Sequence, residues 1–266
     1  MFNYAEIAVD FSVKSYIRKF WIVNNLHNPL FTDGLYALPN GSFTLAFISG
    51  NGAFIETGSY EINLKPGIYF VGQITQRIKL SINPFSKAIM AQVSPWAASL
   101  FTQCPQNELT DQITEVKLLN KKLYEVLNNL DITDDTVLIK AIYSVIEKDL
   151  SGSYDTAMIK TVFKLFNSSL THSPLKMIDL SAQVGFSKRH IEKKFKQYVG
   201  LSPKETYSIL KIRSLINELG AKQSLTSLAF RYGYYDQSHF IKSYATIMES
   251  SPAKFNKTDY ILPFKF

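Results

Sequence analysis

The first hundred residues alternate between short apolar runs and residues that form turns. The run Phe43–Ile48 is almost entirely apolar, with Pro39–Ser42 before it and Ser49–Gly52 after it. In Ile78–Ile82, apolar and polar residues alternate. Short strands bounded by such turns are typical of a β-barrel or a β-sandwich. We therefore expect residues 1–103 to be rich in strands.

Beyond this region the apolar residues take a helical spacing. They recur three or four positions apart over 121–130 and 137–146, and Thr133-Asp134-Asp135 precedes the second stretch as a helix start. From residue 155 onward only the helical period is found. Ser151-Gly152-Ser153 has the composition of a hinge. These patterns predict two domains, 1–153 (β-rich over 1–103, helical over 105–150) and an all-helical 154–266.

Two stretches of the helical region repeat each other. Leu180 and Gly185 correspond to Leu228 and Gly233 at an offset of 48 residues. After one inserted residue the correspondence continues at an offset of 49, and it pairs the following residues: Ser187 with Asp236, His190 with His239, Ile191 with Phe240, Lys193 with Lys242 and Phe195 with Tyr244. A repeat of this kind predicts two copies of one structural unit.

Each copy has the pattern of a helix-turn-helix. A small residue, Ser181 or Ala229, allows two helices to approach closely. Gly185 or Gly233 permits the left-handed backbone of a tight helix end. Ser187 or Asp236 can then cap the next helix. We expect the two units near residues 178–196 and 225–245.

The outward faces of the two second helices carry side chains that can reach base edges or phosphates in a major groove. The predicted DNA-binding residues are Lys188, Arg189, Glu192, Lys193 and Lys196 in the first unit, and Gln237, Ser238, His239 and Lys242 in the second. Two helical hairpins with solvated polar faces are the alternative interpretation. Repetition of the pattern favours DNA binding.

The distribution of charge supports a polyanionic partner for the second domain. Residues 1–153 contain 12 Lys and Arg against 14 Asp and Glu, a net charge of −2, whereas residues 154–266 contain 17 against 8, a net charge of +9. A basic excess confined to one module is typical of nucleic-acid binding, although a basic surface kept for solubility has the same composition.

Residues 155–256 resemble the DNA-binding domain of the AraC/XylS family of bacterial transcription regulators. The similarity rests on Gly200-Leu201-Ser202-Pro203, Lys211-Ile212-Arg213, the run from Tyr232 to Phe240, and Ser251–Phe255. It implies a domain of seven helices in which a long helix, about Pro203 to Leu219, joins two helix-turn-helix units. Asn256 after Phe255 and the acidic Glu192 depart from the family pattern.

Residues 1–115 resemble the family's N-terminal effector domains through Leu38–Ser42, Val71–Thr75 and Glu108–Asp111. This resemblance implies an α+β protein of two domains, with a cupin-like β-barrel followed by helices. The mouth of a barrel is a common ligand site. The side chains that suit such a site by type are Trp21, Tyr36, Phe47, Tyr69, Gln73 and Arg77, with Arg77 as the partner of an anionic ligand.

The sequence argues against chemistry in the first domain. His27 is its one histidine, so a metal site is not expected, and no nucleotide loop or nucleophile motif is found. We expect a sequence-specific transcription regulator, without a catalytic residue, metal or cofactor, that responds to a small-molecule effector. An enzyme or sensor barrel fused to a DNA-targeting module is the alternative; a bound metal or turnover would favour it.

The remaining expectations concern location and partners. No secretory signal or membrane span is found, and Cys104 is the one cysteine, so we expect a cytoplasmic bacterial protein that makes no membrane contact. The partners expected are double-stranded DNA, a small-molecule effector and, if the protein is an activator, RNA polymerase. The apolar stripes of Lys121–Leu150 either form a homodimer or pack on the barrel of the same chain.

Overall fold

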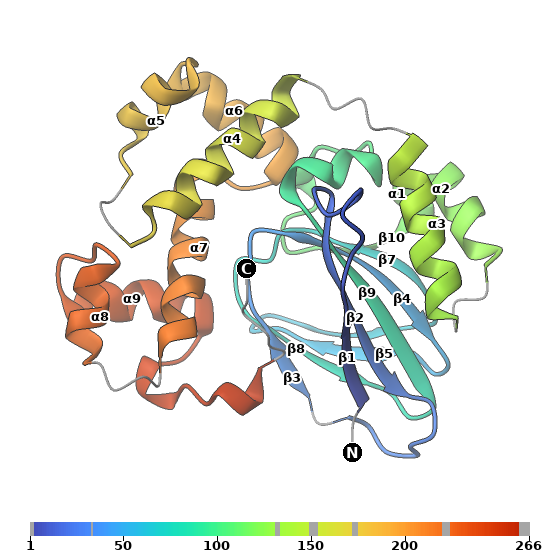
Figure 1. Ribbon diagram of the computed structural model, residues 1–266. Coiled ribbons are helices and arrows are strands. Elements are labelled where there is room, and N and C mark those ends of the chain that lie inside the picture. The colour runs from blue at the N-terminus through green and yellow to red at the C-terminus, as the bar shows by residue number, and fades with distance from the viewer. Residues whose placement is uncertain are drawn as a thin grey trace.

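The computed structural model describes residues 3–32, 34–130, 134–148, 154–171, 175–219 and 224–260. Its first part is built on β-sheets and its second part is helical (Figure 1). This confirms the predicted two-domain α+β architecture. The predicted hinge Ser151–Ser153 and Thr133 lie outside the described residues.

The first domain contains two antiparallel sheets. One has the order β1-β2-β9-β4-β7-β10 and the other the order β3-β8-β5-β6. The strands are β1 (Asn3–Ile7), β2 (Ile17–Asn25), β3 (Leu35–Ala37), β4 (Phe43–Ser49), β5 (Ala53–Glu56), β6 (Glu61–Leu64), β7 (Gly67–Val71), β8 (Ile78–Ile82), β9 (Ser86–Val93) and β10 (Ile113–Glu115).

Both faces of the larger sheet are buried, which explains why its strands are almost continuously apolar. On β4, Phe43, Leu45 and Phe47 pack into one core cluster, whereas Ala46 and Ile48 pack into another between the two sheets. Side chains alternate between the faces of a strand. A strand covered on both sides therefore needs apolar residues at successive positions.

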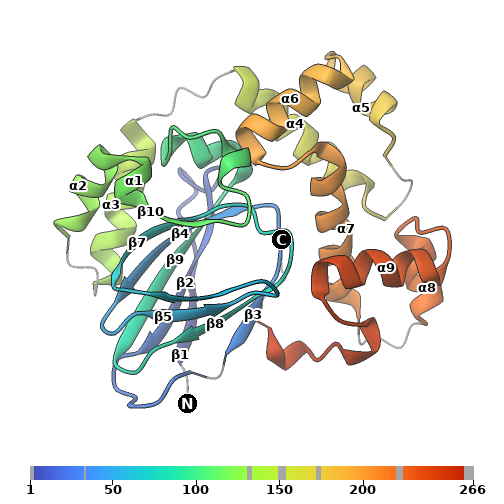
Figure 2. The same cartoon turned by 180° about the vertical axis from the view of Figure 1, so that it is seen from behind.

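Three helices cover the outer face of this sheet (Figure 2). They are α1 (Val116–Leu119), α2 (Lys121–Asn128) and α3 (Asp135–Lys148). The inward stripes of α2 and α3 consist of Leu123, Leu127, Leu138, Ile142 and Ile146, all in the core cluster of the sheet. The stripes thus pack on the barrel of the same chain, as one of the two expectations had it.

The second domain contains α4 (Tyr154–Ser169), α5 (Met177–Val184), α6 (Lys188–Val199), α7 (Pro203–Glu218), α8 (Leu225–Arg231) and α9 (Gln237–Met248). Two short 3₁₀ helices follow among the described residues, at Pro252–Lys254 and Lys257–Asp259. The predicted long helix is α7. Ser202 and Glu205 form a capping box at its start.

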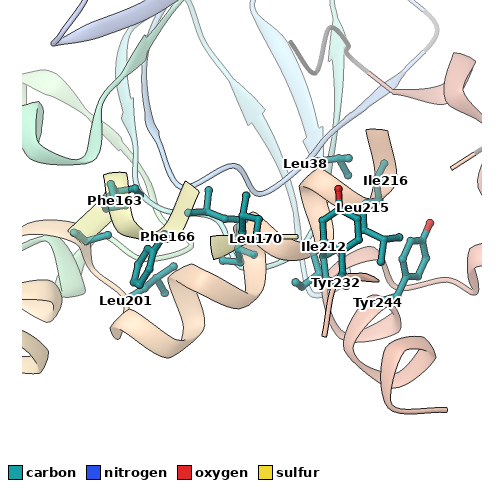
Figure 3. Close-up of a cluster of buried hydrophobic side chains, with 14 of the residues drawn as sticks. Leu38, Phe163, Phe166, Leu170, Leu201, Ile212, Leu215, Ile216, Tyr232 and Tyr244 are labelled. Atoms are coloured by element: carbon teal, nitrogen blue, oxygen red, sulfur yellow. The ribbon is translucent and has the colours of Figure 1, made fainter. Parts of the chain in front are cut away.

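The core of the second domain runs along α4 and α7 and reaches the first domain (Figure 3). Phe163 and Phe166 of α4 and Ile212 of α7 are all buried in it. Leu38, from the turn between β3 and β4, belongs to the same cluster. The two domains therefore share apolar packing at this point.

Candidate DNA interface and effector cavity

In the first unit the structure gives the sequence pattern its predicted geometry. Gly185 ends α5 with a left-handed backbone, φ 72°. The Ser187 hydroxyl accepts a hydrogen bond of 3.2 Å from the His190 amide and so caps α6. Ile191 and Phe195 are fully buried, which directs the opposite face of α6 to solvent. These observations confirm the predicted turn and cap.

The second unit repeats this construction with different residues. Gly233 has φ 68°, directly after the end of α8. The Asp236 carboxylate accepts a hydrogen bond of 2.7 Å from the His239 amide at the start of α9. Phe240 and Tyr244 are fully buried beneath the helix. Both units therefore present a capped helix fixed by two side chains four residues apart.

The predicted DNA-binding side chains lie on the solvent sides of α6 and α9. All are exposed apart from Glu192, which is intermediate. Lys188 lies 3.9 Å from Glu192, and Lys196 lies 3.1 Å from Glu205 on α7. Gln237 Oε1 accepts a hydrogen bond from Thr226 of α8. A role of these residues in contacts with DNA remains a prediction.

Sequence reasoning missed one exposed aromatic residue at the interface. Tyr235 precedes the cap of α9, and its side chain is 85% exposed. It is the residue inserted between the two copies, so it has no counterpart in the first unit to draw attention to it. In helix-turn-helix proteins the N-terminal residues of the second helix contact base edges, and Tyr235 lies beside that end of α9.

A small apolar cavity lies in the first domain. Its volume is about 60 Å³. The lining is Trp21, Ala37, Leu38, Asn40, Ser42, Thr44, Ala46, Ile48, Ile55, Leu64, Tyr69, Val71, Gly72, Ile74, Ile78, Leu80, Ala88 and Met90, none of which is charged. Trp21 Nε1 and Ser42 Oγ are buried without a hydrogen-bond partner. Buried polar groups without a partner destabilise a protein, so a bound molecule that forms hydrogen bonds with these two groups would stabilise this one.

Two of the six predicted ligand residues, Trp21 and Tyr69, line this cavity. Phe47 lies in the core cluster on the opposite face of the large sheet, because it alternates with Ala46 along β4. Gln73 is buried, but it is not among the lining residues. The remaining pair, Tyr36 and Arg77, lies at the contact with the second domain.

The role of Arg77 as the partner of an anionic ligand stays a prediction, but the structure places its side chain outside the apolar cavity. Its guanidinium stacks 4.1 Å from the centre of the Tyr36 ring. It also lies 3.9 Å from Glu249, just after α9, and donates a hydrogen bond to the Tyr260 hydroxyl. The side chain is engaged with the second domain and does not line the cavity.

The contacts between the domains involve both helix-turn-helix units. Near the first unit, the Thr110 hydroxyl donates to the carbonyl of Gly200 at the end of α6. Near the second, the amide of Arg77 donates to the carbonyl of Ile247 at the end of α9. Between them, Arg213 of α7 donates to the carbonyl of Asn40, a residue of the cavity lining. One hydrogen bond thus connects the cavity lining to the helix that joins the two units.

The described residues contain no helix long and apolar enough to cross a membrane. Within the same ranges, no group of three or more His, Cys, Asp or Glu side chains is placed to hold a metal ion.

Comparison with protein families gives one match in each domain. Residues 180–258 match a family described as a helix-turn-helix domain. Residues 6–115 match a family described as a domain of unknown function, DUF6597. None of the curated proteins compared matches the chain.

Several solved structures are similar to this chain. ToxT from Vibrio cholerae is similar over 96% of this chain and 96% of its own, with 14% identity and a TM-score of 0.48. ToxT with a bound unsaturated fatty acid is similar over 88% of this chain and 94% of its own, with 15% identity and a TM-score of 0.46. A regulator from Chromobacterium violaceum with an AraC-type DNA-binding domain covers 37% of this chain and 88% of its own, with 24% identity and a TM-score of 0.35.

Proposed function

We propose that this chain, a DNA-binding transcription regulator with an AraC-type helix-turn-helix domain, inserts α6 and α9 into two major grooves on one side of a DNA duplex. The observation that carries the proposal is the repeated geometry of the two units. Each has a left-handed glycine, a side-chain cap and two buried residues under an exposed polar helix. The single helix α7 joins them, so both helices act as parts of one module.

A footprint of the full-length protein tests this proposal. Bound sequences are first selected from a random duplex pool at low salt and then footprinted. We expect two protected major-groove segments about 10 base pairs apart on one face, because that is the helical repeat of DNA. The double variant Arg189→Ala/Lys242→Ala should lose both segments, whereas the matched control Lys122→Ala, on exposed α2, should keep them. If the protein bound no duplex DNA at low salt, the proposal would be wrong.

The apolar cavity of the first domain is the proposed site of an uncharged organic effector. An uncharged ligand suits it because the lining has no charged side chain, and Trp21 Nε1 and Ser42 Oγ can fix its orientation. The cavity is small, about 60 Å³. An effector that exceeds this space has to move the walls, including the turn that holds Leu38 and Asn40.

That movement would couple the effector to DNA binding. Leu38 packs in the core of the second domain, and the Asn40 carbonyl accepts from Arg213 of α7. A ligand can shift DNA affinity only if it prefers one arrangement of the domains, and the usual size of such coupling is about 1–3 kcal/mol. Thermal-shift screening of full-length protein with uncharged metabolites tests this. Trp21→Phe should weaken any hit, and a hit unaffected by it would place the ligand elsewhere.

We also propose a domain boundary, a dimer surface and a further partner. The chain divides between residues 153 and 154, and limited proteolysis followed by mass spectrometry tests this boundary. A homodimer would use the apolar residues that α1, α2 and α3 leave exposed, Leu118, Val126 and Val137. If the protein activates transcription, it also contacts RNA polymerase.

A further inference from the structure

A polar cleft between the two domains gathers four basic side chains. Its volume is about 300 Å³, and its lining is Lys14, Arg18, Lys19, Gln92, Ser94, Trp96, Asn167 and Arg213. The lining contains no acidic residue. We propose that this cleft binds a small, multiply charged oxyanion, such as phosphate or pyrophosphate, that joins the two domains.

Arg18 is the central residue of this site. Strand β2 changes its register against β9 between Ile17 and Lys19, which is where Arg18 stands. Such an irregularity can redirect a side chain. Arg18 Nη1 is buried and has no hydrogen-bond partner. Burial lowers the pKa of the guanidinium to about 10. A buried donor without an acceptor destabilises the folded protein. A ligand that offers Arg18 an acceptor would therefore stabilise it.

Two further polar groups on the neighbouring strand also lack partners. Gln92 and Ser94, at the end of β9 and just after it, are both almost fully buried. Gln92 Nε2 and Ser94 Oγ make no hydrogen bond. An amide N–H and a hydroxyl are suitable donors to an oxyanion. Three residues that line the cleft from the first domain thus each carry a buried donor group without a hydrogen-bond partner.

The second domain contributes Asn167 from α4 and Arg213 from α7. Arg213 is buried, and its Nη1 donates to the Asn40 carbonyl at 3.2 Å. Its pKa is lowered to about 9, first by burial and then by the positive charge of Arg18. An anion between the two guanidinium groups would convert their repulsion into two charge-assisted hydrogen-bonding interactions.

The residues in and around the cleft indicate which kind of ligand it can bind. Lys19 is already paired with Glu6 at 2.6 Å, so it contributes less than its full charge. Lys160 lies near the rim, where it donates to Ser15 Oγ and stands 5.9 Å from the centre of the Trp96 ring. Trp96 is the only aromatic or aliphatic member of the lining, so a long hydrocarbon chain would find few apolar contacts. The cleft therefore suits a compact anion with more than one negative charge.

This site is separate from the apolar effector cavity and from the DNA-binding helices. Because its lining comes from β2 and β9 on one side and from α4 and α7 on the other, a bound anion would stabilise the present arrangement of the domains. Its binding can be measured without DNA. Failure of this inference would therefore leave the proposed function intact, and the reverse also holds.

Isothermal titration of full-length protein with inorganic phosphate and with pyrophosphate tests the proposal, at an ionic strength held constant with sodium chloride. We expect one saturable site. Arg18→Gln and Arg213→Gln should each weaken binding by about tenfold or more, the effect of losing a hydrogen bond to a charged group. The control Lys122→Gln removes one positive charge from exposed α2 and should bind the anions as the unchanged protein does.

Melting temperatures without phosphate separate ligand binding from a structural role. Arg18→Gln should then melt at the same temperature as the unchanged protein or higher, because it removes an uncompensated buried charge. The proposal is overturned if neither anion binds, if both Gln variants bind them with unchanged affinity, or if acetate, with one charge, binds as tightly. It is also overturned if Arg18→Gln melts well below the unchanged protein without phosphate.

Discussion

The two helix-turn-helix units share a backbone design but differ in charge. Helix α6 carries five Lys or Arg residues and one Glu, whereas α9 carries Lys242 as its one Lys or Arg and no acidic residue. Phosphate contacts determine most of the affinity and salt dependence of DNA binding, and contacts to base edges determine specificity. We therefore expect the first unit to supply most of the affinity and the second to add mainly base discrimination.

The units also differ in how they contact the first domain. The end of α6 lies against the 3₁₀ helix Gln106–Glu108, with one hydrogen bond from Thr110 to Gly200. The end of α9 is held by the amide of Arg77 and by the side chains of Gln76 and Arg77. The two contacts therefore differ in kind: a helix end against a 3₁₀ helix with one hydrogen bond at the first unit, and hydrogen bonds with an ion pair at the second.

The largest expected effects are on folding. Phe195 stacks on Phe163 of α4 at 5.9 Å between ring centres and also contacts Phe166, whereas Phe240 packs against Tyr234 and Tyr244 within its own unit. Each substitution to Ala should lower the free energy of unfolding by about 3–5 kcal/mol, since both rings are fully buried.

Urea unfolding measures both losses. Because Phe195 joins the first unit to α4, Phe195→Ala should also impair DNA binding of the whole module, while Phe195→Leu, which keeps most of the apolar volume, should preserve it. A loss below 1 kcal/mol for both Ala variants would contradict the described core.

The next largest effects are expected from substitutions that remove contacts to bases. Arg189→Ala and Lys242→Ala should each weaken specific binding by about 1–3 kcal/mol if the side chains contact bases. The difference in charge between the two units predicts that Arg189→Ala also weakens binding to random DNA, because Arg189 belongs to the basic helix α6. Lys242→Ala should affect mainly the selected site. Fluorescence anisotropy with selected and random duplexes measures both. Equal losses on the two duplexes for Lys242→Ala would make it a phosphate contact and remove the distinction between the units.

The helix caps are a smaller difference. Ser187→Ala and Asp236→Ala should each lower the free energy of unfolding by about 0.5–2 kcal/mol. Asp236→Ala should cost more, because its carboxylate also interacts favourably with the positive end of the α9 dipole. Asp236→Asn keeps the cap and is the matched control. Thermal unfolding measures the order, and a larger loss for Ser187→Ala would show that tertiary packing fixes α9 without the cap.

The comparison also shows which features the sequence could predict. The repeat fixed the positions of Gly185, Gly233, Ser187 and Asp236, because each depends on backbone conformation within a few residues. The cavity and the polar cleft were harder to predict from the sequence, since they depend on which strand faces lie against each other. Phe47 and Arg77 suited a ligand site by type, but the alternation along β4 and the contact with Glu249 direct them elsewhere. Arg18 gave no signal, because its role arises from a strand irregularity and from Arg213, far along the chain.

The smallest expected effect distinguishes two lysines on the basic helix itself. Lys193 and Lys196 are both exposed on α6, but Lys196 lies 3.1 Å from Glu205. Lys193→Gln should reduce the slope of log affinity against log salt by about 1, the value for one lost phosphate contact. Lys196→Gln should reduce it by less, because Glu205 already neutralises part of that charge. Both variants should weaken selected and random DNA alike. A larger slope change for Lys196→Gln would mean that DNA displaces Glu205 from the lysine, since an exposed ion pair is weak enough to be exchanged for a phosphate.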